Sequence, residues 1–284
     1  MSEPIIHPLL TGSAGQVGSV LAELLSQRFP GAVCATRVEL DITDHDRLNA
    51  EVERLQPNVI INCAAMTDVD GCEREPERAF RVNRDGSRAL ARAASSVGAR
   101  IIHLSTDFVF DGSQQSPYDE EAIPRPLSVY GRSKLDGEQA VMQEADDHVI
   151  VRTSWVFGGQ GAGFVNAVLA RGRDGRPLQV VTDQIGGPTL RDDLAEAVLR
   201  LVEIPYRGII HFANAGHCSR HEFAQQILRE AGISVPVEPI ATVPVAGQAR
   251  RPACSVLDTS RYRRLTGAGV RHWKEALRGY LDSR

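Results

Sequence analysis

The sequence lacks the features that would place the protein in a membrane or send it out of the cell. None of its 284 residues fall in an uninterrupted apolar run of about 18 residues, the length that a membrane-spanning helix needs. The beginning of the sequence has no basic segment followed by an apolar core, so we expect no signal peptide. We therefore expect a protein that has no membrane partner.

Cysteines are few, and basic residues form no tract. The five cysteines are odd in number and widely spaced, and no C-x-x-C occurs, which favours reduced thiols in the cytoplasm over a disulfide framework. The net charge is -4, and the pairs Arg250–Arg251 and Arg263–Arg264 are too short to be basic tracts. We expect each pair to be ordinary solvated surface or to bind a single phosphate, since the chain has no electrostatic footprint for nucleic acid.

A short segment carries His217, Cys218 and His221, which are residue types that bind metal ions. The same segment contains Ser219 and Glu222 in the S-x-x-E pattern of a helix capping box, just ahead of an apolar-periodic run. We favour the beginning of a helix over a metal site at this position.

The first 155 residues alternate short apolar runs with longer helical patterns. The apolar runs are Pro8–Thr11, Ala32–Ala35, Val59–Asn62, Ile101–Ser105 and Val149–Arg152, and the helical patterns are Gln16–Gln27, Asp44–Leu55, Glu77–Val97 and Ser128–Glu144. This alternation is typical of parallel strands joined by crossover helices. The sequence therefore predicts an α/β fold with a Rossmann-like, doubly wound parallel sheet. Because Pro8 cannot donate to a ladder, we expect the first strand to begin late or irregularly.

Beyond Trp155 the pattern loosens, and glycines and prolines interrupt it. A helix at Arg191–Val202 and a strand at Gly208–Ala213 still resemble the first part of the chain. We therefore expect residues 1–154 to form a dinucleotide-binding domain to which residues 190–214 return. Residues 155–284 would form mainly a smaller, interleaved substrate-binding lobe.

A glycine-rich turn, TGSAGQVG at 11–18, lies between the first predicted strand and the first predicted helix. Gly12, Gly15 and Gly18 permit a tight turn, close approach of the backbone to a pyrophosphate, and close packing of helix on strand. The helix N-terminus then presents free N–H groups to the anion. Glycine triplets also occur in ordinary turns, but the position between strand and helix favours a dinucleotide site.

The residue that follows the second strand indicates which cofactor binds. An acidic residue there favours a free 2′-hydroxyl and a cation favours a 2′-phosphate, so Arg37 predicts NADPH, with NADH possible. A surface arginine without this role is the alternative. Asp41 and Ile42 come next and are candidates to line the adenine, while Asp44 either joins them or caps the following helix.

Tyr130 and Lys134 stand four residues apart at the start of a helical pattern, which places both side chains on one helix face. A phenol with a pKa near 10 is a poor acid–base group at neutral pH. A neighbouring ammonium and an oxidised nicotinamide ring would lower that pKa, and the tyrosine would then donate a proton to a carbonyl oxygen while hydride arrives at carbon. The alternative is an exposed helix face, because Y-x-x-x-K is common by chance.

Ser105, Thr106 and Asp107 end the apolar strand that precedes this helix. Ligands of doubly wound folds bind at that edge of the sheet, where Thr106 is a candidate to hydrogen-bond both the substrate carbonyl and the phenol. A strand-ending turn is the alternative for these three residue types. The glycine turn, the strand-end hydroxyl and the Tyr/Lys pair, in this order, favour a reductase site over these alternatives.

The chain resembles an extended short-chain dehydrogenase/reductase and, more narrowly, the dTDP-4-dehydrorhamnose reductase family. The resembling segments span most of the chain in order: TGSAGQVG (11–18), NCAAMTDVDGCE (62–73), HLSTDFVFDG (103–112), VYGRSKLDGE (129–138), VRTSWVFG (151–158), TDQIGGPT (182–189) and RRPACSVLDT (250–259). The resemblance implies NAD(P)H-dependent reduction of the 4-keto group of dTDP-4-dehydro-L-rhamnose to dTDP-L-rhamnose.

The resemblance also implies roles for single residues. Thr106, Tyr130 and Lys134 would form the catalytic triad, and Val69, Thr106, Asp107 and Trp155 would face the sugar. By the resemblance, the cofactor would be lined by Gly15, Gln16, Val17, Asp41, Ile42, Ala65, Met66, Thr67 and Leu104. To these the residue patterns above add Gly12, Gly18, Arg37, Tyr130 and Lys134 as cofactor-binding candidates. Without the family, Trp155 would more often be a packed core aromatic.

Two departures from the family pattern affect the prediction. Many relatives have an acidic residue where Arg37 stands, which strengthens the preference for NADPH. Some carry a glutamate at the position of Val20 that helps hold magnesium between two subunits, and valine cannot ligate a hard cation. We therefore predict no metal and expect a monomer or a homodimer.

Three related activities are alternatives. A sugar-nucleotide dehydratase would need a second acid after Asp107, where this chain has Phe108. A 4-epimerase would hold its cofactor tightly in a roomier pocket, and the sequence leaves it open. A non-catalytic NADP-binding regulatory subunit, like the beta subunit of methionine adenosyltransferase, is disfavoured by the intact Thr106, Tyr130 and Lys134. Rhamnose, its 4-epimer and a deoxysugar of secondary metabolism remain open as products.

Overall fold

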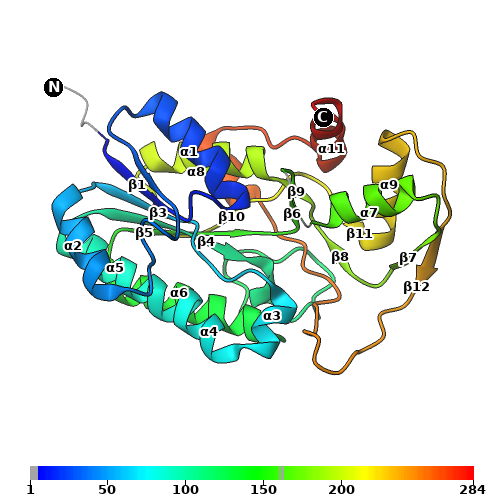
Figure 1. Cartoon of the computed structure of the whole chain (residues 1–284), viewed down its shortest axis with the longest axis horizontal. Helices are drawn as coiled ribbons and strands as arrows, with labels where there is room; N and C mark the ends of the chain where they lie inside the picture. Colours follow the sequence, from blue (N-terminus) through cyan, green and yellow to red (C-terminus); the bar gives the residue numbers. More distant parts are fainter. Residues whose placement is uncertain (1–5, 160, 162) are drawn as a thin grey trace.

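Six parallel strands lie side by side in the computed structural model, which describes residues 6–159, 161 and 163–284 (Figure 1). Their order across the sheet is β10-β5-β4-β3-β1-β2. The strands are β1 (Pro8–Thr11), β2 (Val33–Ala35), β3 (Val59–Asn62), β4 (Arg100–Thr106), β5 (His148–Thr153) and β10 (Gly208–His211). Strand β1 has β2 on one side and β3 on the other, and doubly wound folds bind ligands at the carboxyl ends of the strands beside such a reversal.

Strand β1 begins at Pro8, as the sequence predicts. Proline is tolerated at the first position of a strand, because the residues that follow can still form their ladder hydrogen bonds without its N–H. Before it, the backbone N–H of His7 donates to Oδ1 of Asn58 (2.8 Å) instead of joining a regular ladder.

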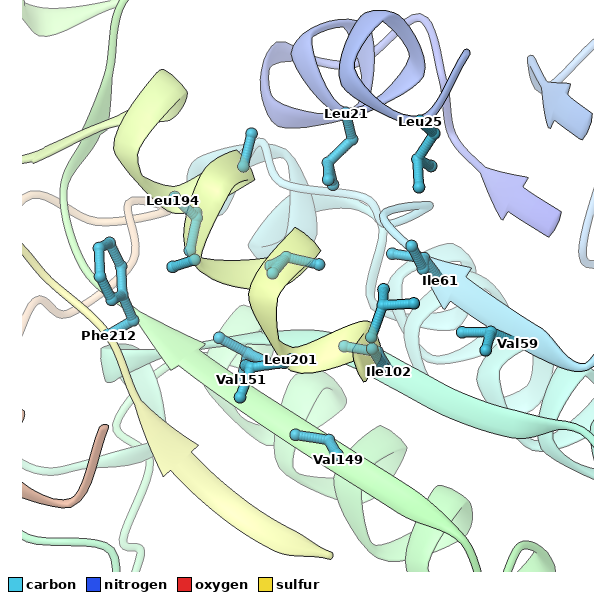
Figure 2. Packing of buried hydrophobic residues seen from close by; sticks show 14 of the residues in the cluster. Leu21, Leu25, Val59, Ile61, Ile102, Val149, Val151, Leu194, Leu201 and Phe212 are labelled. Atoms are coloured by element: carbon cyan, nitrogen blue, oxygen red, sulfur yellow. The ribbon is translucent and has the colours of Figure 1, made fainter. Parts of the chain in front are cut away.

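Alternate residues of the central strands point to opposite faces of the sheet. Leu10, Ile61 and Ile102 pack with α1 (Gln16–Arg28) and α8 (Arg191–Glu203), and Figure 2 shows side chains of both helices directed at this face. The preceding residues of the same strands, Leu9, Ile60 and Ile101, pack on the other face. Both faces of the sheet are therefore buried, which explains why these strands have continuous apolar sequences.

The opposite face is covered by α2 (His45–Leu55), α5 (Ser87–Ser96) and α6 (Val129–Glu144) (Figure 1). Asp44 caps α2, since its side chain accepts from the N–H of Arg47. Three shorter elements lie nearby: α3 (Val69–Arg74), the 3₁₀ turn η2 (Asp107–Val109) and α4 (Pro76–Phe80).

The helix predicted over Glu77–Val97 is present, but one part of it is not α-helical. The segment is divided into α4, a π-helical turn η1 (Arg81–Gly86) and α5. The π turn directs Asn83 so that its side chain bonds both backbone groups of Met66, donating to its O (3.1 Å) and accepting from its N–H (2.8 Å). Wider helical turns of this kind are frequently found near functional sites.

Helix α6 approaches its neighbours very closely. A Cβ on Gly131 would lie 2.2 Å from the carbonyl oxygen of Phe108, and a Cβ on Gly137 would lie 2.2 Å from that of Asn83. Only glycine fits at these two positions. The backbone of α6 is therefore seated against η2 on one side and η1 on the other.

The second lobe, at the right of Figure 1, is built from short elements that follow β5. Three strand pairs hold it together: β6 (Val156–Phe157) with β9 (Thr189–Leu190), β7 (Leu178–Val181) with β12 (Val237–Ile240), and β8 (Ile185–Gly186) with β11 (Cys218–Ser219). Its helices are α7 (Phe164–Arg173), α9 (Arg220–Glu230) and α11 (Trp273–Asp282), and α10 (Ser260–Thr266) packs near β10.

Segments of the two lobes alternate along the chain, so the lobes are interleaved, as the sequence predicts. After β9 it returns to the large sheet through α8 and β10, and β10 pairs with β5. The strand is shorter than predicted, since it ends at His211. No helix in the described part of the chain is long and apolar enough to cross a membrane.

The helix start predicted in the second lobe is confirmed. Ser219 accepts from the N–H of Glu222 (3.1 Å), and the Glu222 carboxylate accepts from the N–H of Ser219 (2.7 Å), which completes the capping box of α9. Cys218 is buried, and Nε2 of His221 lies 3.0 Å from the carbonyl oxygen of Val237.

A fully buried ion pair links α6 to the large sheet. Arg152 on β5 donates two hydrogen bonds to the Glu138 carboxylate on α6 (2.9 and 2.7 Å), and Ser105 on β4 donates a third (2.5 Å). The exposed fractions of Arg152 and Glu138 are 2% and 0%. Removing one partner of such a pair leaves a buried charge without compensation.

We predict that Arg152→Met lowers the free energy of unfolding by about 3–5 kcal/mol, because Glu138 stays buried without its partner. Urea unfolding followed by circular dichroism measures this loss. The matched control is Arg54→Met, which breaks an exposed pair with Glu51 and should cost less than about 1 kcal/mol. Equal losses in the two variants would contradict the importance of the buried pair.

Candidate active site

A cavity of about 650 Å³ opens at the carboxyl ends of the parallel strands, between the large sheet and the second lobe. Its walls come from the turn after β1, the segment after β3, the end of β4, the start of α6 and the segment after β5. The sequence-predicted residues that line it are Gly15, Gln16, Val17, Gly18, Ala65, Thr67, Val69, Leu104, Thr106, Asp107, Tyr130, Lys134 and Trp155. The cavity therefore brings together most of the predicted site.

The glycine turn forms the wall beside β1. Gly12 has a positive φ of 75°, and a Cβ there would lie 2.7 Å from the backbone nitrogen of Ala64. A Cβ on Gly18 would lie 2.1 Å from the carbonyl oxygen of Gly12, so this glycine lets α1 pack on the turn. Gly15 is the N-cap of α1 and has no side chain to bond the first N–H groups. These features fit a dinucleotide, whose pyrophosphate would accept from those N–H groups.

Tyr130 lies in the first turn of α6, which Ser128 caps by accepting from the N–H of Gly131 (3.1 Å). Burial raises the pKa of Tyr130, while its hydrogen bond with Thr106 acts in the opposite direction. The sequence led us to expect the Lys134 ammonium to lower this pKa. That lowering is absent here: burial and the charge of Asp107 both raise the pKa, and the Lys134 nitrogen is directed at the carbonyl oxygen of Leu104. The phenol is therefore held in its protonated form, which is the form that donates.

Lys134 is one helical turn further along α6 and is 2% exposed. Its Nζ donates to the carbonyl oxygen of Leu104 (2.6 Å) and lies 3.3 Å from Nε2 of His103. Burial lowers the pKa of Lys134 to about 8, and the nearby Glu138 carboxylate limits that shift. The lysine is thus charged at neutral pH, but its pKa lies only slightly above that pH.

Thr106 and Asp107 come from the end of β4, as the sequence predicts. Oγ1 of Thr106 donates to the Asp107 carboxylate (3.1 Å) and accepts from the N–H of Phe108 (3.1 Å). Ser255 donates a second hydrogen bond to Asp107 (2.5 Å). Burial raises the pKa of Asp107 to about 6, although both hydroxyls and the charge of Arg220 act in the opposite direction.

Trp155 closes the cavity from the side of the second lobe. Its backbone has a φ of 44°, which is rare for a residue other than glycine. A Cβ on Gly186 would lie 2.3 Å from its ring, so this glycine leaves the space that the indole occupies. The guanidinium carbon of Arg220 lies over the same ring, 3.5 Å from its centroid.

Five predicted cofactor residues lie outside the lining of this cavity: Gly12, Arg37, Asp41, Ile42 and Met66. Gly12 packs against the backbone of Ala64. Arg37 and Asp41 follow β2 and form an ion pair, with Nε of Arg37 3.0 Å from the Asp41 carboxylate. Ile42 is buried against Gly86. Contact of these residues with a cofactor stays a prediction.

Several residues that the sequence analysis did not assign to the site also lie at the cavity. Among them, Asp70, Arg220 and Arg251 line it with charged side chains, and Ser255 donates a hydrogen bond to Asp107. Arg251 donates to the Asp70 carboxylate (2.8 Å), which ties the tail of the second lobe to α3. The RRPACSVLDT block contains both Arg251 and Ser255 and was a usable signal for them, but no pattern distinguishes Arg220.

The described residues, 6–159, 161 and 163–284, contain no group of three or more His, Cys, Asp or Glu side chains arranged to hold a metal ion. The five cysteines are all free thiols.

The parallel sheet, the glycine turn and the Thr/Tyr/Lys set in one cavity define the class of this protein, an extended short-chain dehydrogenase/reductase. The family model described as RmlD substrate binding domain matches residues 6–284. The chain belongs to this family.

Relatives and solved structures agree with this assignment over nearly the whole chain. The chain is 39% identical over 278 residues to the spore coat polysaccharide biosynthesis protein SpsK of Bacillus subtilis, covering 97% of each protein. It is 40% identical over 279 residues to the dTDP-4-dehydrorhamnose reductase of Mycobacterium tuberculosis, covering 95% of this chain and 90% of that protein. It superposes on the dTDP-4-dehydrorhamnose reductase of Bacillus anthracis in complex with NADP with a TM-score of 0.93, at 36% identity, covering 98% of this chain and 99% of that one.

We predict that Arg37→Ala weakens the binding of NADPH by about 10- to 100-fold, because a charge-assisted hydrogen bond to the 2′-phosphate is lost. Binding of NADH should change little. Fluorescence titration of the purified protein with each cofactor measures both dissociation constants. Equal weakening of the two cofactors would contradict a role for Arg37 at the 2′-phosphate.

Proposed function

We propose that this protein reduces the 4-keto group of dTDP-4-dehydro-L-rhamnose to give dTDP-L-rhamnose, with NADPH as the reductant. The observation that carries the proposal is the convergence of Thr106, Tyr130 and Lys134 in one cavity with the glycine turn. The relative from M. tuberculosis is named for this substrate, and the B. anthracis structure contains NADP.

The cofactor supplies a hydride to the carbonyl carbon when it is bound. Gly15, Gln16 and Val17 would hold its pyrophosphate, and Lys134 would hold its ribose and so position its reactive end. Tyr130 donates its phenolic proton to the substrate oxygen as negative charge develops there. The Thr106 hydroxyl, which donates to Asp107 in the structure, would turn its single proton to the same substrate oxygen and so orient the ketone for attack.

The arginines of the second lobe bind the other end of the substrate. The described chain places no carboxylate within ion-pair distance of Arg220, and its guanidinium lines the cavity beside Trp155. Arg251 also lines the cavity, close enough for its charge to act on Arg220. A diphosphate is the group that this pair of cations suits, because guanidinium groups bind phosphate oxygens in pairs. The sugar would then lie between Trp155 and Tyr130, near Val69 and Asp107.

In this proposal each lobe binds a different ligand. Residues 1–154, with 190–214, bind the cofactor, and the rest of residues 155–284 bind mainly the nucleotide sugar. The five free thiols suit a reducing compartment, so we place the reaction in the cytoplasm. Nothing in the proposed chemistry needs a second subunit or a metal ion.

We predict that Tyr130→Phe lowers kcat by about 100-fold or more, because the proton donor is lost, while the dissociation constant for NADPH stays nearly unchanged. The assay follows NADPH absorbance with dTDP-4-dehydro-L-rhamnose and with a panel of other nucleotide ketosugars. NMR of the product defines the configuration at carbon 4.

The matched control is Tyr118→Phe, whose hydroxyl bonds Asp111 outside the cavity and which should keep most of the rate. Turnover by Tyr130→Phe at the wild-type rate would overturn the role of the phenol. Failure of the wild-type protein to oxidise NADPH with any ketosugar would favour the regulatory-subunit alternative.

We predict that Arg220→Met raises the KM for the nucleotide sugar by about 10- to 100-fold, since a charge-assisted contact to the diphosphate is lost. Methionine keeps an apolar contact with Trp155, so kcat should fall much less. Arg229→Met on the same helix is the control and should leave KM unchanged, because Arg229 does not line the cavity. An unchanged KM in Arg220→Met would place the diphosphate elsewhere.

A further inference from the structure

A chain of buried polar side chains leads from β1 to Lys134. Oγ1 of Thr11 donates to Oδ1 of Asn62 (2.9 Å), and Nδ2 of Asn62 lies 3.0 Å from Nδ1 of His103. Nε2 of His103 lies 3.3 Å from Nζ of Lys134. The exposed fraction is at most 2% for each of these four residues. The mechanism proposed above uses only the lysine.

The side-chain amide of Asn62 has only one possible orientation. One of its terminal atoms lies 3.0 Å from the backbone nitrogen of Ala64, whose N–H can only donate, so this atom must be the oxygen. The NH₂ group therefore faces the other way, toward Oγ of Ser87 (3.4 Å) and Nδ1 of His103 (3.0 Å). Both hydrogens and both lone pairs of the amide have partners.

The orientation of Asn62 determines where His103 carries its proton. Burial and then the charge of Lys134 lower the pKa of His103 well below its ordinary value, so the ring is neutral. Because Nδ1 accepts from Asn62, the single ring proton lies on Nε2. The Nε2–H group is directed at Nζ of Lys134. An ammonium in that place meets a second donor, whereas an uncharged amine accepts the hydrogen bond.

We propose that His103, oriented by Asn62, is a positioning residue that donates a hydrogen bond to the uncharged amine of Lys134 and so allows this lysine to release its proton when Tyr130 is reprotonated. This inference rests on the proposed reductase function. In the step, an N–H bond of Lys134 breaks and the O–H bond of Tyr130 forms again. The electron pair stays on Nζ and accepts from Nε2–H. His103 keeps its own proton, and solvent returns a proton to Lys134 after the product has left the cavity.

The other groups that face Lys134 favour its charged form. From its own helix the Glu138 carboxylate, which is paired with Arg152, attracts the ammonium, and the Cys63 thiol after β3 acts in the same direction. Burial opposes both and lowers the pKa of Lys134 to about 8. The carbonyl oxygen of Leu104 accepts from Nζ in either form. His103 is thus the neighbour whose hydrogen bond favours the amine.

The first test reads the tautomer of His103 in the intact wild-type protein, without substrate. Protein labelled with ¹⁵N-histidine is studied by NMR, and the His103 signals are assigned by their loss in His103→Gln. We expect a neutral ring with its proton on Nε2 across the neutral pH range. A proton on Nδ1, or a ring that becomes charged in this range, would overturn the proposal.

The second test moves the proton to the other ring nitrogen. In Asn62→Asp a carboxylate oxygen replaces the NH₂ group, so Nδ1 must donate and Nε2 accepts from the Lys134 ammonium. Wild-type kcat should fall as the pH rises through the pKa of Lys134, near 8. This alkaline limb should move upward by about one pH unit or more in the variant, because the charged lysine is stabilised.

Two further variants separate the hydrogen bond from the added charge. His103→Gln offers an amide oxygen to the ammonium without a new charge and should move the alkaline limb in the same direction. Ser87→Ala removes one bond from Asn62 but leaves its contact with His103, so it is the matched control and should not move the limb.

The outcomes distinguish this inference from the proposed function. An alkaline limb that stays in place in Asn62→Asp and His103→Gln, in enzyme that still needs Tyr130, would overturn the role of His103 and leave the reduction intact. Absence of ketosugar reduction by the wild type would remove the reductase function and, with it, the reprotonation step. The tautomer measured by NMR would then decide only the hydrogen-bond arrangement.

Discussion

Helix α6 has no room for a methyl group at two of its positions, and the active site depends on that closeness. Gly131 lies against the carbonyl oxygen of Phe108, and Gly137 lies against that of Asn83. These contacts are six residues apart, so together they fix how closely the helix approaches its neighbours and how it is rotated about its own axis. Tyr130 and Lys134 project from the same turns. Their place beside the end of β4 therefore follows from backbone packing, which holds reacting groups more rigidly than flexible side chains do.

The polar groups buried around this helix are nearly all compensated by a partner. Glu138 has Arg152 and Ser105, and Asn62 uses every hydrogen and lone pair of its amide. Unpaired groups at this depth would cost several kcal/mol, roughly the stabilisation that a few well-packed side chains supply. Lys134 differs from them because its best partner changes with its protonation state.

The sequence predicted the sheet and the centre of the site because both arise from local patterns. Paired apolar residues such as Leu9 and Leu10 face opposite sides of the sheet, and the four-residue spacing of Tyr130 and Lys134 defines a helix face. The π turn at 81–86 was missed, since one wider turn hardly changes an apolar pattern read along the chain. Arg220 was missed for another reason. Its place at the cavity depends on how α9 packs beside Trp155, and no local pattern encodes a contact between segments that are far apart in the sequence.

Asp107 shows why the lobes are interleaved rather than joined in series. It belongs to the end of β4, yet Ser255, from the tail of the second lobe, holds its carboxylate, and Arg220 from α9 contributes charge to it. The tail is tied back to α3 by the pair of Arg251 and Asp70. Neither half of the chain can complete this cavity alone. The return of the chain to the large sheet through α8 and β10 anchors the second lobe on both sides, so the groups that would bind the sugar are held in register with the phenol and the lysine.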